Sequence, residues 1–326
     1  MSERPPWEIK REIRVKAEDA TSPDYGCPPD ERDIIQLMRF GVIVIDKVPG
    51  PTSHEVAAWV KKLLELDRVG HGGTLDPKVT GVLPVTLQDS TKVVQALLDS
   101  GKEYVCVMRT HSEETETKIR DTLGMFVGEI YQRPPLRSSV SRRLRTRRIY
   151  GIDFLEGDGK NWLFKVQCQS GTYIRKLCYD VGEILGAGAH MQELRRTRSG
   201  PFVESQAVTM YDLVDAIDMR SMGDEKPLRA MIHPIEDSLA LLSKIWVRDS
   251  AVEAVCNGAQ LAVPGIVRYE TGISENDLIA VLTQKEEVVA LMNAEMSSGK
   301  IQAEDHGIAA TIVRVVMPSG VYPKSW

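Results

Sequence analysis

Apolar residues change their spacing abruptly near the start of the first well-patterned region. Residues 42–45 are continuously apolar and read as a buried strand. After a Pro/Gly-rich turn, apolar residues recur at helical spacing as Val56, Trp59, Val60, Leu63 and Leu64. Ser53 is the expected N-cap, and the five apolar residues should form one core-facing stripe. This region must therefore pack a helix against a strand.

Similar patterns follow without strict alternation of strands and helices. We expect a helix starting at Asp89 or Ser90, strands over residues 104–108 and 162–168, and a helix after Gly171. The last of these carries its apolar stripe at positions 174, 177, 178, 181, 184 and 185. The pattern predicts an α+β fold with a mixed or antiparallel sheet.

The length of 326 residues favours two domains over one. Residues 1–36 are charged and Pro-rich, with scattered apolar anchors, and should form an arm that lies on another domain. Residues 37–237 form the predicted first domain, with a polar, Met- and Pro-containing linker over residues 221–238. Short strand-like runs separated by Gly, Pro and Asn predict a small β-barrel-like domain over residues 238–326.

Several classes of protein are disfavoured at once. No apolar run approaches the roughly 18 residues that a membrane span needs, and the N-terminus lacks the apolar core of a secretory signal. The five cysteines form no CxxC pair and no metal-ligand spacing, so we expect free thiols in a reducing compartment and no metal site. A cytoplasmic location follows as the expectation.

The net charge of −5 argues at first against a nucleic-acid partner. Divided by segment, however, residues 34–200 carry 25 basic and 19 acidic groups, and the flanking segments are all acidic. Seven arginines fall within residues 133–148 with no acid among them: Arg133, Arg137, Arg142, Arg143, Arg145, Arg147 and Arg148. Arginine matches phosphate geometry, so a mobile RNA- or DNA-binding arm and a solvated basic loop are both open readings.

The densest special segment covers residues 70–84, Gly-His-Gly-Gly-Thr-Leu-Asp-Pro-Lys-Val-Thr-Gly-Val-Leu-Pro. It lacks the Gly-Lys-Ser/Thr of a phosphate loop, and His71 has no partners at zinc spacing. What remains is a carboxylate, Asp76, that Pro77 pushes toward an extended backbone. Such a carboxylate suits nucleophilic or acid/base chemistry, although a tight turn explains the residues equally simply.

These residues closely resemble the catalytic loop of the TruB-type pseudouridine synthases, in the variant of the archaeal and eukaryotic dyskerin branch. Further motifs are similar to that family in the same order, at Asp46-Lys47, Lys102-Glu103-Tyr104, residues 170–175 and residues 194–202. The bacterial branch has Lys-Pro where this chain has Lys47-Val48-Pro49. The C-terminal region, including residues 257–259 and 264–266, looks like a PUA domain.

The resemblance implies the isomerisation of uridine to pseudouridine, which requires neither cofactor nor metal. By resemblance, Asp76 is the catalytic carboxylate, Arg175 pairs with it, and Tyr104 stacks on the target base. Leu194 lines the uracil pocket, Lys47 bounds it, and His71 enters the RNA as the base leaves its stack. Attack on the base, attack on the sugar and proton abstraction from the sugar all remain open as the role of Asp76.

In the dyskerin branch the Arg-rich segment, about residues 132–150, is the thumb loop that closes over RNA. The PUA domain and the N-terminal arm bind an H/ACA guide RNA, with Gly258 and Ala259 as expected contacts. The implied partners are guide RNA, substrate rRNA or tRNA, a small Nop-type protein, a Gar-type protein and a kink-turn-binding protein, with no membrane. Two alternatives remain, namely a stand-alone enzyme acting on the TΨC arm of tRNA and a non-catalytic RNA scaffold.

Overall fold

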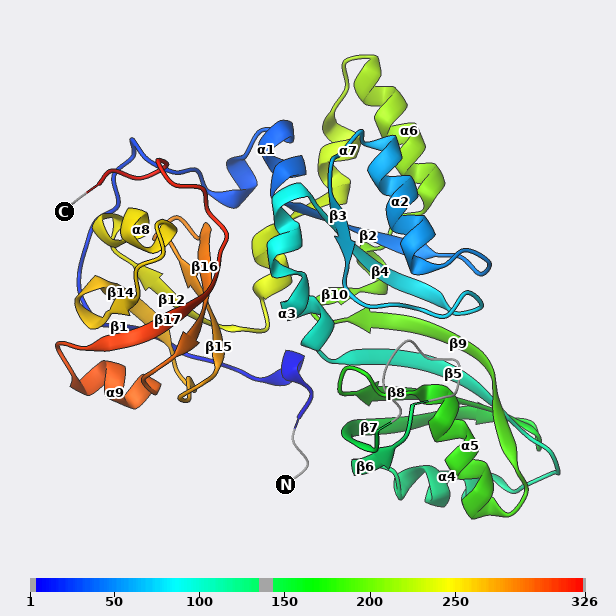
Figure 1. Ribbon diagram of the computed structural model, residues 1–326. Coiled ribbons are helices and arrows are strands. Elements are labelled where there is room, and N and C mark those ends of the chain that lie inside the picture. The colour runs from blue at the N-terminus through cyan, green and yellow to red at the C-terminus, as the bar shows by residue number, and fades with distance from the viewer. Residues whose placement is uncertain (1–3, 135–142, 325–326) are drawn as a thin grey trace.

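The computed structural model describes residues 4–134 and 143–324, which form two sheets with helices packed around them (Figure 1). The larger sheet has the strand order β11-β2-β4-β9-β5-β8-β7-β6, with β3 paired to β4 and β10 to β9. The smaller has the order β1-β14-β12-β15-β16-β17-β13. Each sheet belongs to one of two bodies that lie side by side, and the α+β prediction is confirmed.

The larger body contains most of the helices of the described chain. Its strands are β2 (Gly41–Lys47), β3 (Val69–His71), β4 (Thr80–Leu87), β5 (Lys102–Thr110), β6 (Gly128–Gln132), β7 (Arg145–Gly157), β8 (Asn161–Cys168), β9 (Ala189–Ser199), β10 (Phe202–Val203) and β11 (Ile232–Pro234). Its helices are α1 (Ile34–Arg39), α2 (Ser53–Leu63), α3 (Val94–Asp99), α4 (Glu116–Gly124), α5 (Ile174–Leu185), α6 (Met210–Ser221) and α7 (Lys226–Met231).

The smaller body is built mainly from the C-terminal part of the chain. Its strands are β12 (Ser243–Val247), β13 (Leu261–Ala262), β14 (Ile266–Glu270), β15 (Leu278–Leu282), β16 (Val288–Ala294) and β17 (Ile308–Val315), with the helices α8 (Asp249–Cys256) and α9 (Ser298–Ala303). The N-terminal strand β1 (Ile13–Val15) pairs antiparallel with β14 and completes this sheet. The N-terminal segment therefore lies along the C-terminal body (Figure 1).

Three local expectations differ from the structure. Thr52, not Ser53, caps α2, because its hydroxyl accepts from the backbone N–H of Glu55 while the Glu55 carboxylate accepts from that of Thr52. Trp59 and Ile184 are 45% and 55% exposed, so neither helical stripe is wholly buried. Two-layer packing buries a narrower arc of α2 and α5 than their apolar residues span.

The stretch over residues 221–238 is not the linker that its polar composition predicts. It folds into α7, the strand β11 and a 3₁₀ turn over Ile235–Leu239. β11 pairs antiparallel with β2, with Ile232 opposite Ile43, and so forms the edge of the large sheet. Pairing with a distant strand supplies the hydrogen bonds that the local sequence cannot reveal.

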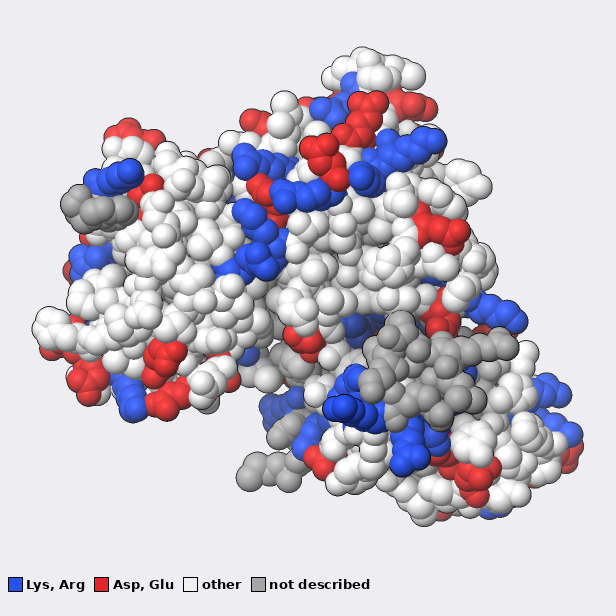
Figure 2. Space-filling model, viewed as in Figure 1, with Lys and Arg blue, Asp and Glu red and all other residues white. Residues whose placement is uncertain are grey.

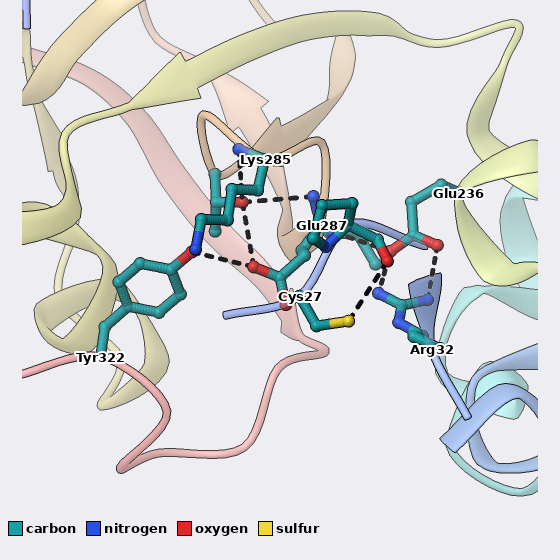
Figure 3. Close-up of polar contacts among 9 residues, drawn as sticks. Cys27, Arg32, Glu236, Lys285, Glu287 and Tyr322 are labelled. Atoms are coloured by element: carbon teal, nitrogen blue, oxygen red, sulfur yellow. Dashed lines mark hydrogen bonds and ion pairs between the residues drawn. The ribbon is translucent and has the colours of Figure 1, made fainter. Parts of the chain in front are cut away.

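The two bodies share a buried contact. The residues Val93, Leu239, Trp246 and Leu291, among others, form one apolar cluster drawn from both sides. Beside it, Arg32 makes a bidentate ion pair with Glu236, both contacts at 2.8 Å, and Glu236 also accepts from the backbone N–H of Val288. Figure 3 shows Arg32 and Glu236 facing each other next to the Cys27, Glu287 and Tyr322 group.

Candidate active site

A cavity of about 580 Å³ opens where the residue 73–79 loop meets β5, β9 and the start of α5. The residues at its wall include Asp76, Tyr104, Arg175, Leu194 and Arg196. The central strands set this arrangement, because β9 pairs parallel with β4 on one side and antiparallel with β5 on the other. Residues that the sequence predicts as a site from four separate motifs therefore share one cavity.

Asp76 and Arg175 form an ion pair at the mouth of this cavity. About half of each side chain remains exposed, so the carboxylate is accessible from solvent. Arg175 is the second residue of α5, where the helix dipole disfavours a cation. The Asp76 carboxylate offsets that cost, and the ion pair with Arg175 holds Asp76 at the cavity.

Hydrogen bonds with two buried side chains hold the loop that carries Asp76. The buried Lys47 ammonium donates to the carbonyls of Val48, Pro77 and Val79, at 3.0, 3.0 and 2.9 Å. The Ser53 hydroxyl accepts from the backbone N–H of Leu75 at 2.8 Å. Lys47 lies beneath the loop and is not among the residues at the cavity wall, so its contact with the pocket stays a prediction.

Tyr104 and Leu194 both contribute side chains to the cavity wall. Tyr104 lies opposite Arg196 in the register of β5 and β9, and both residues are at the cavity wall. Desolvation raises the pKa of Tyr104, and the nearby Arg196 charge opposes that rise. A protonated phenol thus faces an exposed carboxylate across a cavity with an apolar side.

Comparisons with known proteins agree with this geometry. Four family models match: the TruB family pseudouridylate synthase N-terminal domain at residues 61–174, the tRNA pseudouridylate synthase B C-terminal domain at 175–240, the PUA domain at 243–316 and the DKCLD domain at 4–57. A relative from Methanopyrus kandleri, named probable tRNA pseudouridine synthase B, is 53% identical over 99% of this chain and 96% of its own.

The chain belongs to the TruB family of pseudouridylate synthases. A relative with the same name from Pyrococcus horikoshii is 54% identical over 98% of this chain and 97% of its own. Among solved structures, a chain of a Cbf5-Nop10-Gar1 complex matches with a TM-score of 0.96 and 52% identity, covering 99% of both chains. A chain of an H/ACA RNP bound to a substrate RNA containing 2′-deoxyuridine matches with a TM-score of 0.93 and 50% identity, covering 98% of this chain and 99% of that one.

His71 of this synthase lies near the cavity but is not among the residues at its wall. Its ring is half-buried and packs edge-on against His54, with centroids 4.7 Å apart. Burial, then the His54 and Arg196 charges, lower the pKa of His71 to about 4. The ring is therefore neutral at pH 7 and lies against His54 in this structure.

Part of the Arg-rich segment of the synthase belongs to the large sheet. Arg137 and Arg142 lie outside the described residues, while Arg133 follows β6 directly. The predicted bounds of 132–150 are too wide, because Arg145, Arg147 and Arg148 belong to β7, which pairs with β6. Figure 2 shows Lys and Arg side chains gathered over the region of β6 and β7.

Gly258 and Ala259 form an exposed turn after α8, far along the chain from the cavity motifs. Their backbone N–H groups donate to the carbonyls of Val255 and Ala254, both at 3.0 Å. Gly258 has a φ of +97°, which explains the glycine without reference to RNA.

Sequence reasoning missed two buried cations of this synthase that lie at the cavity, Arg196 and Lys102. Both fall inside the family motifs, and strand alternation could have placed Arg196 on the same face as Leu194. Within residues 4–134 and 143–324, no three His, Cys, Asp or Glu side chains gather as metal ligands. Nor does that part of the chain contain a helix with the length and hydropathy to cross a membrane.

Proposed function

We propose that this chain converts uridine in rRNA or tRNA to pseudouridine with Asp76 as the reacting carboxylate. One observation carries the proposal, namely that the Asp76–Arg175 ion pair opens onto a cavity lined by Tyr104 and Leu194. The cavity of about 580 Å³ has room for one flipped-out nucleotide, and flipping is required because a stacked base is out of reach of the carboxylate.

Each side chain then has a defined task. Asp76 attacks the base or the sugar, or removes a sugar proton, and Arg175 holds it in position. Tyr104 presents its ring and hydroxyl to the flipped uracil, and Leu194 supplies an apolar wall. His71 would have to rotate out of its contact with His54 to enter the RNA. Lys47 serves the reaction by holding the loop that carries Asp76.

We further propose that the enzyme works as the catalytic subunit of an H/ACA particle. The support is the likeness over 98–99% of the chain to proteins solved with Nop10 and Gar1 and with substrate RNA. The partners would be the guide RNA, the substrate RNA, a Nop-type protein, a Gar-type protein and a kink-turn-binding protein. The relatives at 52–55% identity are archaeal, which favours a cytoplasmic location.

The division of labour follows the two bodies of the structure. We assign catalysis to residues 37–237 and guide-RNA binding to residues 238–326, with the arm of residues 1–36 laid along the second body. In support, β1 completes the C-terminal sheet through its pairing with β14. Gly258 and Ala259 are proposed RNA contacts because they form an exposed turn.

Conversion of a target uridine, measured with and without guide RNA and partner proteins, tests the proposal. We expect efficient conversion only in the assembled particle, and loss of conversion by Asp76→Asn in that particle. Conversion of tRNA by the isolated chain with no effect of guide RNA would instead support a stand-alone enzyme. Binding of guide RNA without any conversion would support a scaffold, and full activity of Asp76→Asn would refute the mechanism.

A further inference from the structure

Arg196 is a buried cation that has no carboxylate partner within the described part of the chain. Its side chain is part of β9 and is only 1% exposed. Its Nε–H donates to the carbonyl of Val82 at 2.8 Å, and its Nη2 donates to that of Gly73 at 3.1 Å. None of the ion pairs formed among residues 4–134 and 143–324 includes Arg196. Burying a guanidinium without a counter-ion costs free energy, and hydrogen bonds to two carbonyls offset only part of that cost.

Besides burial, the charge of Arg196 lowers the pKa of two neighbouring lysines. Desolvation lowers the pKa of Lys102 to about 7, and the Arg196 charge is the next contribution. The pKa of Lys47 is lowered by the same two causes in the same order. Arg196 thus adds positive potential at the cavity wall, and because its own side chain is buried, its charge interactions there are strong.

The proposed reaction needs positive potential at this place. When the N1–C1′ bond breaks, its electron pair stays with the uracil ring, which carries the negative charge until C5 bonds to C1′. C5 then loses its proton and N1 gains one, so the isomerisation balances without any other reactant. Attack of Asp76 on the base also puts negative charge on the ring, and hence all three open routes share this requirement.

We infer that Arg196 is an electrostatic positioning residue, which holds the Tyr104 hydroxyl toward the target base and stabilises the negative charge that uracil acquires. The inference rests on the proposed function. Two observations support it: Arg196 lies at the cavity wall, and it is opposite Tyr104 in the strand register. A preorganised donor of this kind acts on the transition state more than on the bound substrate.

The experiment compares Arg196→Gln and Arg196→Lys in the assembled particle. The control is Arg198→Gln on the same strand, where the guanidinium stacks on Trp7 and does not reach the cavity wall. Single-turnover rates and RNA dissociation constants are measured with a target uridine and with 5-fluorouridine at the same position. Fluorine stabilises the ring anion, and disappearance of 5-fluorouridine from a nucleoside digest reports N1–C1′ cleavage.

We expect Arg196→Gln to lower the uridine rate by about 100- to 1000-fold, as loss of one oxyanion donor does, with RNA affinity changed less than about threefold. Arg196→Lys keeps the charge and should recover part of that rate. With 5-fluorouridine, the rate loss caused by Arg196→Gln should be at least tenfold smaller, because fluorine already stabilises the anionic base. Arg198→Gln should behave as the unmodified chain does.

A rate loss of equal size for uridine and 5-fluorouridine would assign Arg196 a merely structural role and overturn the inference. If Arg196→Gln does not fold, Arg196→Lys decides the matter by the same ratio of the two substrates. Conversion by the unmodified chain separates the two claims. If the unmodified chain converts the target uridine, equal rate losses for uridine and 5-fluorouridine refute the inference alone. If the unmodified chain does not convert it, the proposed function fails and the inference fails with it.

Discussion

Replacing Lys47 by Met tests whether this residue holds the loop that carries Asp76 or forms part of the pocket. The Lys47 side chain is 1% exposed and its ammonium donates to three backbone carbonyls, two of them at Pro77 and Val79 on either side of Lys78. Methionine fills nearly the same volume but donates nothing. The substitution therefore removes the hydrogen bonds with little change in packing.

The magnitude follows from those three contacts. Each buried carbonyl left without a donor costs about 1–3 kcal/mol, although the three losses are not additive. Against this, burial lowers the pKa of Lys47, so the folded state also loses an unfavourably placed charge. We expect a net destabilisation of about 2–4 kcal/mol, which for a domain of some 200 residues corresponds to a Tm lower by about 5–15 °C.

The assay combines thermal unfolding with single-turnover conversion and RNA binding. We expect Lys47→Met to lower Tm and the conversion rate while leaving RNA affinity unchanged. The control is Lys78→Met, an exposed position in the same loop, whose Tm should stay within about 2 °C of the unmodified chain. Weaker RNA binding at unchanged Tm would refute this reasoning and restore Lys47 to the pocket.

Three more outcomes follow from particular contacts. Arg32→Met should cost about 3–5 kcal/mol because it strands the buried Glu236 carboxylate, and adding Glu236→Leu should restore much of that stability in a double-mutant cycle measured by denaturant unfolding. Because the folded-state pKa of His71 is about 4, the unfolded chain takes up its proton first as pH falls from 6.5, so Tm should drop through that window. His71→Asn should remove about 1–2 kcal/mol of this pH dependence, after allowance for partial exposure. Replacing Arg143 and Arg147 by Ala should flatten the salt dependence of RNA binding by about 0.7–0.9 in log–log slope for each lost phosphate contact, and an unchanged slope would exclude them from binding.

Much of the fold is visible in the sequence because burial imposes a period on it. Residues 42–45 lie within β2, and the alternation over residues 162–168 matches β8, where Trp162, Phe164 and Val166 are buried. The same reasoning fails over residues 221–238, where the apolar content is low and the strand β11 exists only through its pairing with β2. The local sequence pattern indicates which residues are buried, whereas the pairing of distant strands depends on the tertiary structure.

The site divides in the same way. Asp76, Tyr104 and Arg175 stand in motifs whose likeness to a family brings them together, and the structure places them at one cavity. Arg196 stands between Arg195 and Arg198, and an Arg-rich stretch predicts a solvated surface. Alternation along β9 could place Arg196 on the face of Leu194, but it is the register with Tyr104 and Gly81 that encloses this one guanidinium. A parallel neighbour on one side and an antiparallel one on the other cannot be read from spacing.

The contact between the two bodies bears directly on how a guide would select a target. The cluster around Trp246 and Leu239, with the Arg32–Glu236 pair beside it, joins the bodies through well-buried groups rather than through a flexible linker. On the proposed function, a rigid contact of this kind fixes the distance between an RNA stem held by the C-terminal body and the Asp76 carboxylate. Guide length must then match that distance, and loosening the contact should lower the selectivity for the target uridine before it abolishes catalysis.

Arg32→Met in the assembled particle provides the check. Conversion at uridines neighbouring the target should rise relative to the target itself, while single-turnover chemistry at the target changes little at temperatures where the variant remains folded. Loss of conversion at every position in equal proportion would show instead that the contact serves stability alone.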